Sequence, residues 1–224
     1  AMETILFTKL HPPLISMKIV GRSRLVERLK SLRPFTLLCA PPGFGKTTLI
    51  GEWMRVNELK LAWLSLDADD NDASRFISYV IAALQTIKPE IGATSTLLMQ
   101  TSPVADFKTI LSSLLNDLTK QDSTIILVLD DYHVIHADAI HKLLAFILDH
   151  PPAMLRLIVT TRSDPPFPLA RLRSRGLLTE IRADDLRFTA DEAAEFLNQS
   201  MELNLSSTDI AALEEHTEGW IASL

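Results

Sequence analysis

One short glycine-containing stretch constrains this chain more than any other feature of its sequence. The apolar run Phe35–Ala40 ends in the turn Pro41–Gly45, and Lys46-Thr47-Thr48 then opens a segment with helical spacing of its apolar residues. An apolar strand, a glycine-containing loop and a helix in this order form a phosphate-binding loop, or P-loop. The stretch therefore predicts a strand–loop–helix unit whose loop binds phosphate.

The residue types in this loop fit phosphate chemistry. Gly43 and Gly45 permit the backbone angles and the close approach that phosphate oxygens need, and the N-terminus of the following helix favours anions. Lys46 would reach the β- and γ-phosphates, and the hydroxyl of Thr47 would coordinate Mg²⁺. The residues expected to bind the nucleotide here are Gly43, Phe44, Gly45, Lys46, Thr47 and Thr48.

The loop departs from the strict P-loop pattern. Ala40 stands where that pattern begins with glycine, and Pro41 and Pro42 carry no N–H group. The hydrogen-bond donors must then come mainly from Gly43 onward. Because glycine–lysine–threonine also occurs in ordinary turns, a second half of the site is needed to support the prediction.

That second half follows another apolar run. Residues 124–129 read as a strand buried on both faces, and they end in Asp130 and Asp131. Asp130 would hold Mg²⁺, while Asp131 is placed to orient or activate the attacking water. Arg162, at the end of the next predicted strand, would sense the γ-phosphate, with a surface salt bridge as the alternative explanation.

The wider pattern is an alternation of strands and helices. It predicts an α/β fold, a P-loop three-layer sandwich with a mainly parallel five-stranded sheet. Ligands in such sheets bind at the carboxyl ends of the strands. From a capping box at Thr189 onward only helices are predicted, so we expect a nucleotide-binding domain over 1–188 and the beginning of a helical domain, truncated, over 189–224.

Composition excludes several classes of protein. A net charge of −6 gives no global signature of nucleic-acid binding. The single cysteine, Cys39, excludes an internal disulfide framework and suits the cytoplasm. No apolar run has the length of a membrane span, so no membrane partner is expected.

Three other site hypotheses are weaker. The acidic stretch from Asp67 lacks the glycine and glutamate of a calcium loop, and a solvated loop is the better interpretation, with Asp72 as the cap of the next helix. The histidines at 133, 136 and 141 match no recognised zinc spacing. Residues 119–122 resemble a guanine-reading signature but precede the acidic strand, so chance explains them better.

Five motifs in order resemble one family. The chain is similar to the MalT-like group of LuxR-type transcriptional regulators, which belong to the STAND class of signal-transducing P-loop ATPases. Members of this group commonly begin the loop with alanine–proline, as this chain does. The motifs that carry the resemblance are Ala40–Thr48, Trp63–Asp67, Leu127–His133, Thr161–Pro166 and Leu186–Thr189.

The resemblance implies a switch. In this family ADP holds a closed monomer, inducer and ATP open it to self-associate, and hydrolysis resets it; this makes the chain a weak regulatory ATPase with ATP or ADP and Mg²⁺ as cofactors. The inducer would bind a sensor domain and DNA a C-terminal helix-turn-helix, both expected outside these 224 residues. Val20, Gly21 and Arg22 match the segment that lines the adenine, and Gly219–Ile221 lies where related ATPases often carry a further base-contacting motif.

Two other functions remain open from the residues. A self-sufficient AAA-like ATPase would need an arginine from a neighbouring subunit and steady turnover by this segment alone. A small-molecule kinase would need an arginine-rich lid, for which the basic stretch 171–175 is the only candidate.

Overall fold

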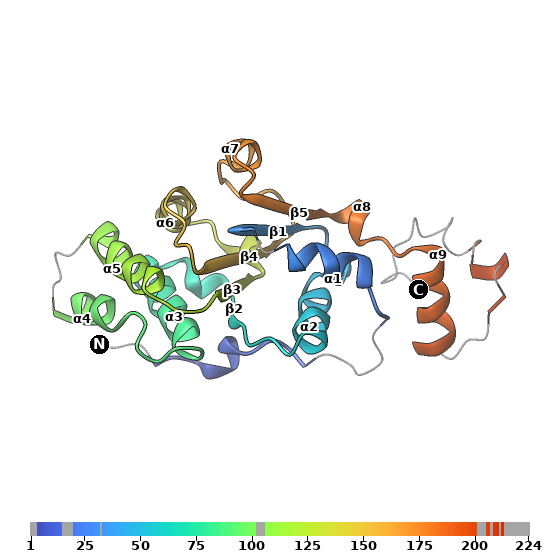
Figure 1. The fold of residues 1–224 in the computed structure, drawn as a ribbon, viewed down its shortest axis with the longest axis horizontal. Helices are drawn as coiled ribbons and strands as arrows, with labels where there is room; N and C mark the ends of the chain where they lie inside the picture. Colours follow the sequence, from blue (N-terminus) through green and yellow to red (C-terminus); the bar gives the residue numbers. More distant parts are fainter. Residues whose placement is uncertain are drawn as a thin grey trace.

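The computed structural model describes residues 4–14, 20–31, 33–101, 106–200, 205, 206, 208–210 and 212. Its centre is a parallel sheet of five strands in the order β2–β3–β4–β1–β5 (Figure 1). All four strand pairings are parallel, which confirms the predicted fold class. The strands are β1 (Phe35–Cys39), β2 (Ala62–Ser65), β3 (Ile125–Asp130), β4 (Leu155–Thr161) and β5 (Leu178–Arg182).

Helices cover both faces of the sheet, because successive strand residues point to opposite sides. On β1, Leu37 packs into one hydrophobic core and Leu38 into the other. The core on the Leu38 side includes side chains of α1 (Ser23–Lys30) and α2 (Lys46–Val56). The core on the Leu37 side includes α3 (Ala73–Gln85), α5 (Phe107–Thr119) and α6 (Asp138–Asp149), which Figure 1 shows gathered on the other side of the sheet.

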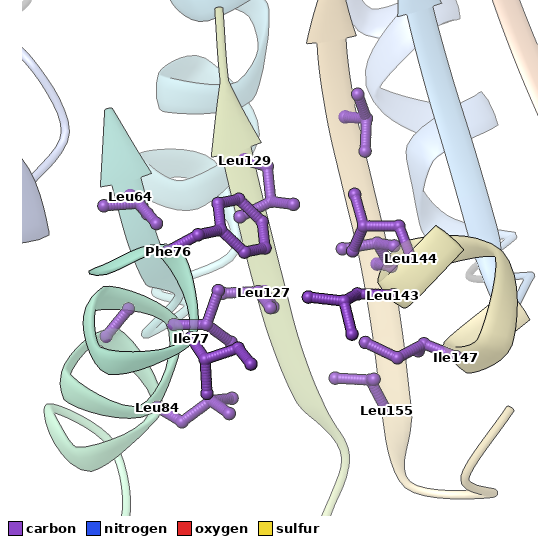
Figure 2. Close-up of a cluster of buried hydrophobic side chains, with 14 of the residues drawn as sticks. Leu64, Phe76, Ile77, Leu84, Leu127, Leu129, Leu143, Leu144, Ile147 and Leu155 are labelled. Atoms are coloured by element: carbon purple, nitrogen blue, oxygen red, sulfur yellow. The ribbon is translucent and has the colours of Figure 1, made fainter. Parts of the chain in front are cut away.

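The larger core shows why these segments are helices. Figure 2 shows one face of α3 and one face of α6 lying over the central strands β3 and β4. Their apolar residues recur at helical spacing, so each helix buries one stripe. The labelled side chains are Leu64, Phe76, Ile77, Leu84, Leu127, Leu129, Leu143, Leu144, Ile147 and Leu155, all in this core.

Shorter elements complete the chain. The described helices also include α4 (Ala93–Thr101), α7 (Leu169–Ser174), α8 (Ala183–Leu186), α9 (Ala190–Glu195), the 3₁₀ turns η1 (Phe7–Leu10), η2 (Ala68–Asn71) and η3 (Tyr132–Val134), and the π-helical segment η4 (Phe196–Ser200). No helix in the part of the chain that the structure describes is long and apolar enough to cross a membrane.

Side-chain caps confirm two predicted helix starts. Asp72 accepts a hydrogen bond from the Arg75 amide and caps α3. Thr189 and Glu192 form the predicted capping box of α9. Helix α5 begins at Phe107, with Asp106 as its cap. Helix α4 was not predicted, because its threonine- and serine-rich sequence has no clear apolar face.

The interpretation of the acidic loop from Asp67 as solvated was wrong for one residue, Asp70. Near the N-terminus, the 3₁₀ turn η1 buries Lys9. Asp70 is fully buried and pairs with Lys9 and Arg75. Local sequence patterns do not indicate the burial of Lys9 and Asp70, because the two residues are separated by 61 positions.

The boundary near residue 188 stays a prediction. Ala193, Leu197 and Ile210 form a small hydrophobic cluster separate from the two sheet-covering cores. Residues 219–221, for which a base-contacting role was considered, lie outside the described part of the chain.

Candidate functional site

The carboxyl ends of three neighbouring strands carry the predicted site residues. β1 leads into the P-loop, β3 ends at Asp130, and β4, which lies between them, leads into Arg162. Because all three strands are parallel, these ends meet at one edge of the sheet. The order of the strands thus brings together residues that are up to 122 positions apart, from Ala40 to Arg162.

The loop after β1 has the backbone that a phosphate cradle needs. Gly43 and Gly45 adopt positive φ angles of 85° and 71°, a region that only glycine enters without strain. Gly45 is the N-cap of α2 and supplies no capping side chain. The first amides of α2 are therefore free of a side-chain cap, which is the arrangement that favours an anion.

Lys46 lies across the base of this loop. Its Nζ atom donates to the carbonyl oxygens of Ala40 at 2.7 Å and of Pro41 at 3.0 Å, and the residue is buried. Burial lowers the pKa of Lys46, while the nearby charges of Asp131 and Asp130 act to raise it. The ammonium group is thus a partly desolvated cation held between the loop and the two acids.

Asp130 and Thr47 form the pair expected for Mg²⁺. The Thr47 hydroxyl donates to the Asp130 carboxylate, at 3.0 Å to Oδ1 and 3.2 Å to Oδ2. Asp130 is only 3% exposed, and this burial raises its pKa against the hydrogen bonds that it accepts. A hydroxyl and a carboxylate side by side at the end of a phosphate loop are the hard oxygen donors that fit Mg²⁺.

Asp131 is far more exposed than Asp130. Its backbone is left-handed, with φ at 61°, and its side chain is 52% exposed. The carboxylate Oδ1 lies 3.6 Å from Nδ1 of His133. Burial, followed by the charge of Arg162, lowers the pKa of His133, so a neutral ring beside Asp131 is favoured.

Arg162 directly follows β4 and is exposed. Its charge lowers the pKa of both Lys46 and His133, which places it within electrostatic reach of the loop. Among the residues that the structure describes, no hydrogen bond or ion pair to its side chain is found. The surface salt bridge considered as an alternative therefore has no partner in the described chain.

The segment Val20–Arg22 contacts the P-loop through Arg22. The amide of Arg22 donates to Oε1 of Glu52 on α2 at 2.9 Å. Its guanidinium donates to the carbonyls of Leu186 at 2.7 Å and of Phe44 at 3.4 Å. Burial lowers the pKa of Arg22 to about 10. This arginine thus connects the P-loop to the residues just before the helical C-terminal part.

The structure adds one residue that sequence reasoning missed. Thr160 on β4 is fully buried and contacts both acids, donating to Oδ1 of Asp130 at 2.6 Å and accepting from the amide of Asp131 at 2.9 Å. The only sequence signal for it is its position two residues before Arg162. Within the described ranges no group of three His, Cys, Asp or Glu residues is placed to hold a metal ion.

Comparison with known proteins agrees with this geometry. Residues 18–160 match the model of the AAA ATPase domain family. The chain is 36% identical over 219 residues to the HTH-type transcriptional regulator MalT of Yersinia pestis, covering 97% of this chain and 24% of that protein. MalT of Yersinia enterocolitica is 35% identical over the same length. The chain thus spans about a quarter of the length of the curated relatives it matches, and the resemblance to MalT-like proteins is confirmed.

Solved structures agree on the fold. A STAND protein with a tetratricopeptide repeat sensor from Pyrococcus horikoshii superimposes with a TM-score of 0.71 at 17% identity, covering 97% of this chain and 30% of that chain. Cdc6p from Pyrobaculum aerophilum superimposes with a TM-score of 0.54 at 15% identity, over 86% of this chain and 52% of the other. At these identities the likeness concerns the fold alone.

Proposed function

Because this chain belongs to the AAA ATPase domain family, we propose that it binds ATP and ADP with Mg²⁺ and hydrolyses ATP slowly. The observation that carries the proposal is the contact between Thr47 at the start of α2 and Asp130 at the end of β3. A P-loop hydroxyl beside a buried carboxylate is the arrangement by which P-loop proteins hold Mg²⁺ against the nucleotide phosphates. An isolated glycine–lysine–threonine turn would have no such partner.

The proposed roles follow from the contacts of each residue. The amides from Gly43 onward bind the phosphate oxygens, and the Lys46 ammonium, now on two carbonyl oxygens, turns to the β- and γ-phosphates. Thr47 and Asp130 hold the metal ion, which when bound neutralises charge on the phosphates. Asp131 orients the attacking water with its exposed carboxylate.

Two further contacts are proposed for the nucleotide. Arg162, without a partner among the described residues, binds the γ-phosphate as a charged donor. Val20, Gly21 and Arg22 line the adenine, a role supported by the hydrogen bond from Arg22 to the Phe44 carbonyl within the P-loop. Together with Phe44 and Thr48 these residues complete the predicted nucleotide site.

The biological role that we propose is a signal-responsive switch in a transcriptional regulator. The similarity to HTH-type regulators named MalT supports it. In this proposal the ATP state permits self-association and the ADP state does not, because the γ-phosphate contacts exist in one state only. An inducer and DNA would bind parts of a longer protein that correspond to the rest of those relatives, and the protein would act in the cytoplasm.

Nucleotide titration tests the core of the proposal. Lys46→Ala removes the ammonium that faces the phosphates, so we expect the affinity for ATP and ADP to fall by about 100-fold or more. Lys60→Ala, a change of the same charge at an exposed site, serves as the matched control and should bind as the wild type does. Unchanged affinity of the Lys46 variant would show that the loop is no phosphate cradle.

A second measurement separates a switch from a self-sufficient ATPase. Sedimentation with ADP and with a non-hydrolysable ATP analogue gives the oligomeric state, and phosphate release gives the basal turnover. A monomer with slow turnover supports the switch. A stable ring with steady turnover, or transfer of phosphate to an added small-molecule acceptor, would favour the AAA-like module or the kinase instead.

A further inference from the structure

The hydroxyl of Thr160 acts as a hydrogen-bond donor to one acid of the site and as an acceptor from the other. It donates to Oδ1 of Asp130 at 2.6 Å and accepts from the main-chain amide of Asp131 at 2.9 Å. A threonine hydroxyl has a single proton to donate. Thr160 donates that proton to Asp130, and its oxygen accepts the amide hydrogen of Asp131.

Strand geometry explains why Thr160 is in this position. Leu129 of β3 pairs with Val159 of β4 in parallel register, so Thr160 comes beside Asp130. Strand residues alternate between the faces of the sheet, and Ile158 lies in the core beneath α1 and α2. Thr160, two residues later, points to that same face, on which α2 begins.

The two hydrogen bonds have different consequences for the acids. The bond to Oδ1 fixes the rotation of the Asp130 carboxylate, while Oδ2 is contacted only by the Thr47 hydroxyl, at 3.2 Å, among the described residues. The bond from the Asp131 amide holds the chain at the point where Asp131 takes its left-handed conformation. Such a conformation is unfavourable for a residue other than glycine and persists only where neighbours hold it.

We propose that Thr160 is a positioning residue for ATP turnover, whose hydroxyl sets the orientation of Asp130 and Asp131 relative to each other. The inference rests on the proposed function, because the acids need this alignment only if they act on Mg²⁺ and water. Thr160 itself touches neither. Its loss should therefore lower the turnover rate and leave nucleotide affinity nearly unchanged.

Three variants test the role of the hydroxyl. Thr160→Val keeps the shape and removes the hydroxyl, and it should lower the turnover number by about 10- to 100-fold, the effect of losing a hydrogen bond to a charged group. Thr160→Ser keeps the hydroxyl and should restore most of the rate. Thr36→Val makes the same change at another buried threonine, on β1, and should leave the rate unchanged.

Amide hydrogen exchange gives a readout that does not depend on activity. The Asp131 amide should exchange slowly in the wild type and in Thr160→Ser, and about 10-fold faster or more in Thr160→Val. The amide of Ile135, which donates to the Tyr132 carbonyl at 3.0 Å, is the internal control and should not change. A general loosening of the fold would accelerate both amides.

The outcomes distinguish a failure of the proposed function from a failure of the inference about Thr160. Absence of nucleotide binding by the wild-type chain overturns the proposed function. Wild-type turnover in Thr160→Val, or a turnover loss that Thr160→Ser does not restore, overturns the inference about Thr160 alone. If Thr160→Val does not fold, fast exchange of the Asp131 amide in the wild type overturns it, and slow exchange with full turnover in Thr160→Ser supports it.

Discussion

The buried ion pair of Lys9 predicts a measurable loss of stability on substitution. Lys9 donates to Oδ2 of Asp70 at 2.5 Å and to Oδ2 of Asp67 at 2.9 Å. Its side chain is 7% exposed and that of Asp70 is 0% exposed. The contact attaches η1 to the loop that follows β2, which is an edge strand of the sheet. It thereby joins residues that are 61 positions apart.

Lys9→Met removes the charge and keeps an unbranched apolar side chain of similar length. Removing one partner of a buried pair costs about 3–5 kcal/mol, because the other charge stays buried without compensation. Asp70 keeps a hydrogen bond from Arg75 at 3.2 Å and one from the Asp67 amide at 2.9 Å. We therefore expect the lower part of that range, about 3 kcal/mol, including the lost contact of the ammonium with the Tyr79 ring.

Urea unfolding at pH 7 measures the effect, with Lys30→Met as the matched control. Lys30 makes an equally short contact of 2.5 Å with Glu27, but the two side chains are 44% and 67% exposed. Because solvent screens this exposed pair, Lys30→Met should lower the free energy of unfolding by only about 0.5 kcal/mol. Equal losses in the two variants, or no loss for Lys9→Met, would refute the argument that burial decides the magnitude.

The pH dependence of the same contact has a definite sign. Burial lowers the pKa of Lys9, but its hydrogen bonds to Asp70 and Asp67 outweigh this and raise it above 10.5. A group with a raised pKa in the folded state contributes fully below the unfolded value and loses the contribution as pH rises through the folded value. The difference between Lys9→Met and the wild type should therefore be constant from pH 7 to pH 9.

Two further predictions concern the metal site and acid stability. Asp130→Asn should bind ATP but lose Mg²⁺-dependent turnover by about 100-fold or more, because a metal-holding carboxylate supports several kcal/mol of transition-state stabilisation; normal turnover in a phosphate-release assay would place the metal elsewhere. Glu180→Gln should destabilise the chain at neutral pH by about 1 kcal/mol, a value kept small because the partner side chain of Arg173 is 55% exposed. The hydrogen bond from Arg173 lowers the pKa of Glu180 from 4.5 to about 2, with a smaller effect from Arg182 and despite burial, which acts to raise it. The stabilisation by the Glu180 carboxylate is therefore present above pH 4.5 and is lost as pH falls towards 2. Urea unfolding of both proteins at pH 7 and pH 3 checks this, and an equal difference at both pH values would contradict it.

The sequence by itself determined the strand–helix alternation and indicated most residues of the candidate site. The strands β1 and β3 appear in the sequence as mostly apolar runs, and the loop after β1 carries glycine at the two positions of positive φ, Gly43 and Gly45. These signals are local, so β1, the loop at Gly43 and Gly45, and the acids after β3 could be located without coordinates. The caps at Asp72 and Thr189 were local as well, since a cap contacts amides two or three residues away.

Only the tertiary structure decided the order of the strands and the contacts that depend on it. The insertion of β4 between β1 and β3 is what places Thr160 beside Asp130 and Arg162 near Lys46. The burial of Asp70 needs Lys9 from the N-terminal segment, and the contacts of Arg22 need Leu186, which lies 164 residues later in the chain. Such pairs produce no periodic pattern in the sequence. Strand pairing and ion pairing join residues whose separation along the chain is not fixed by any local rule.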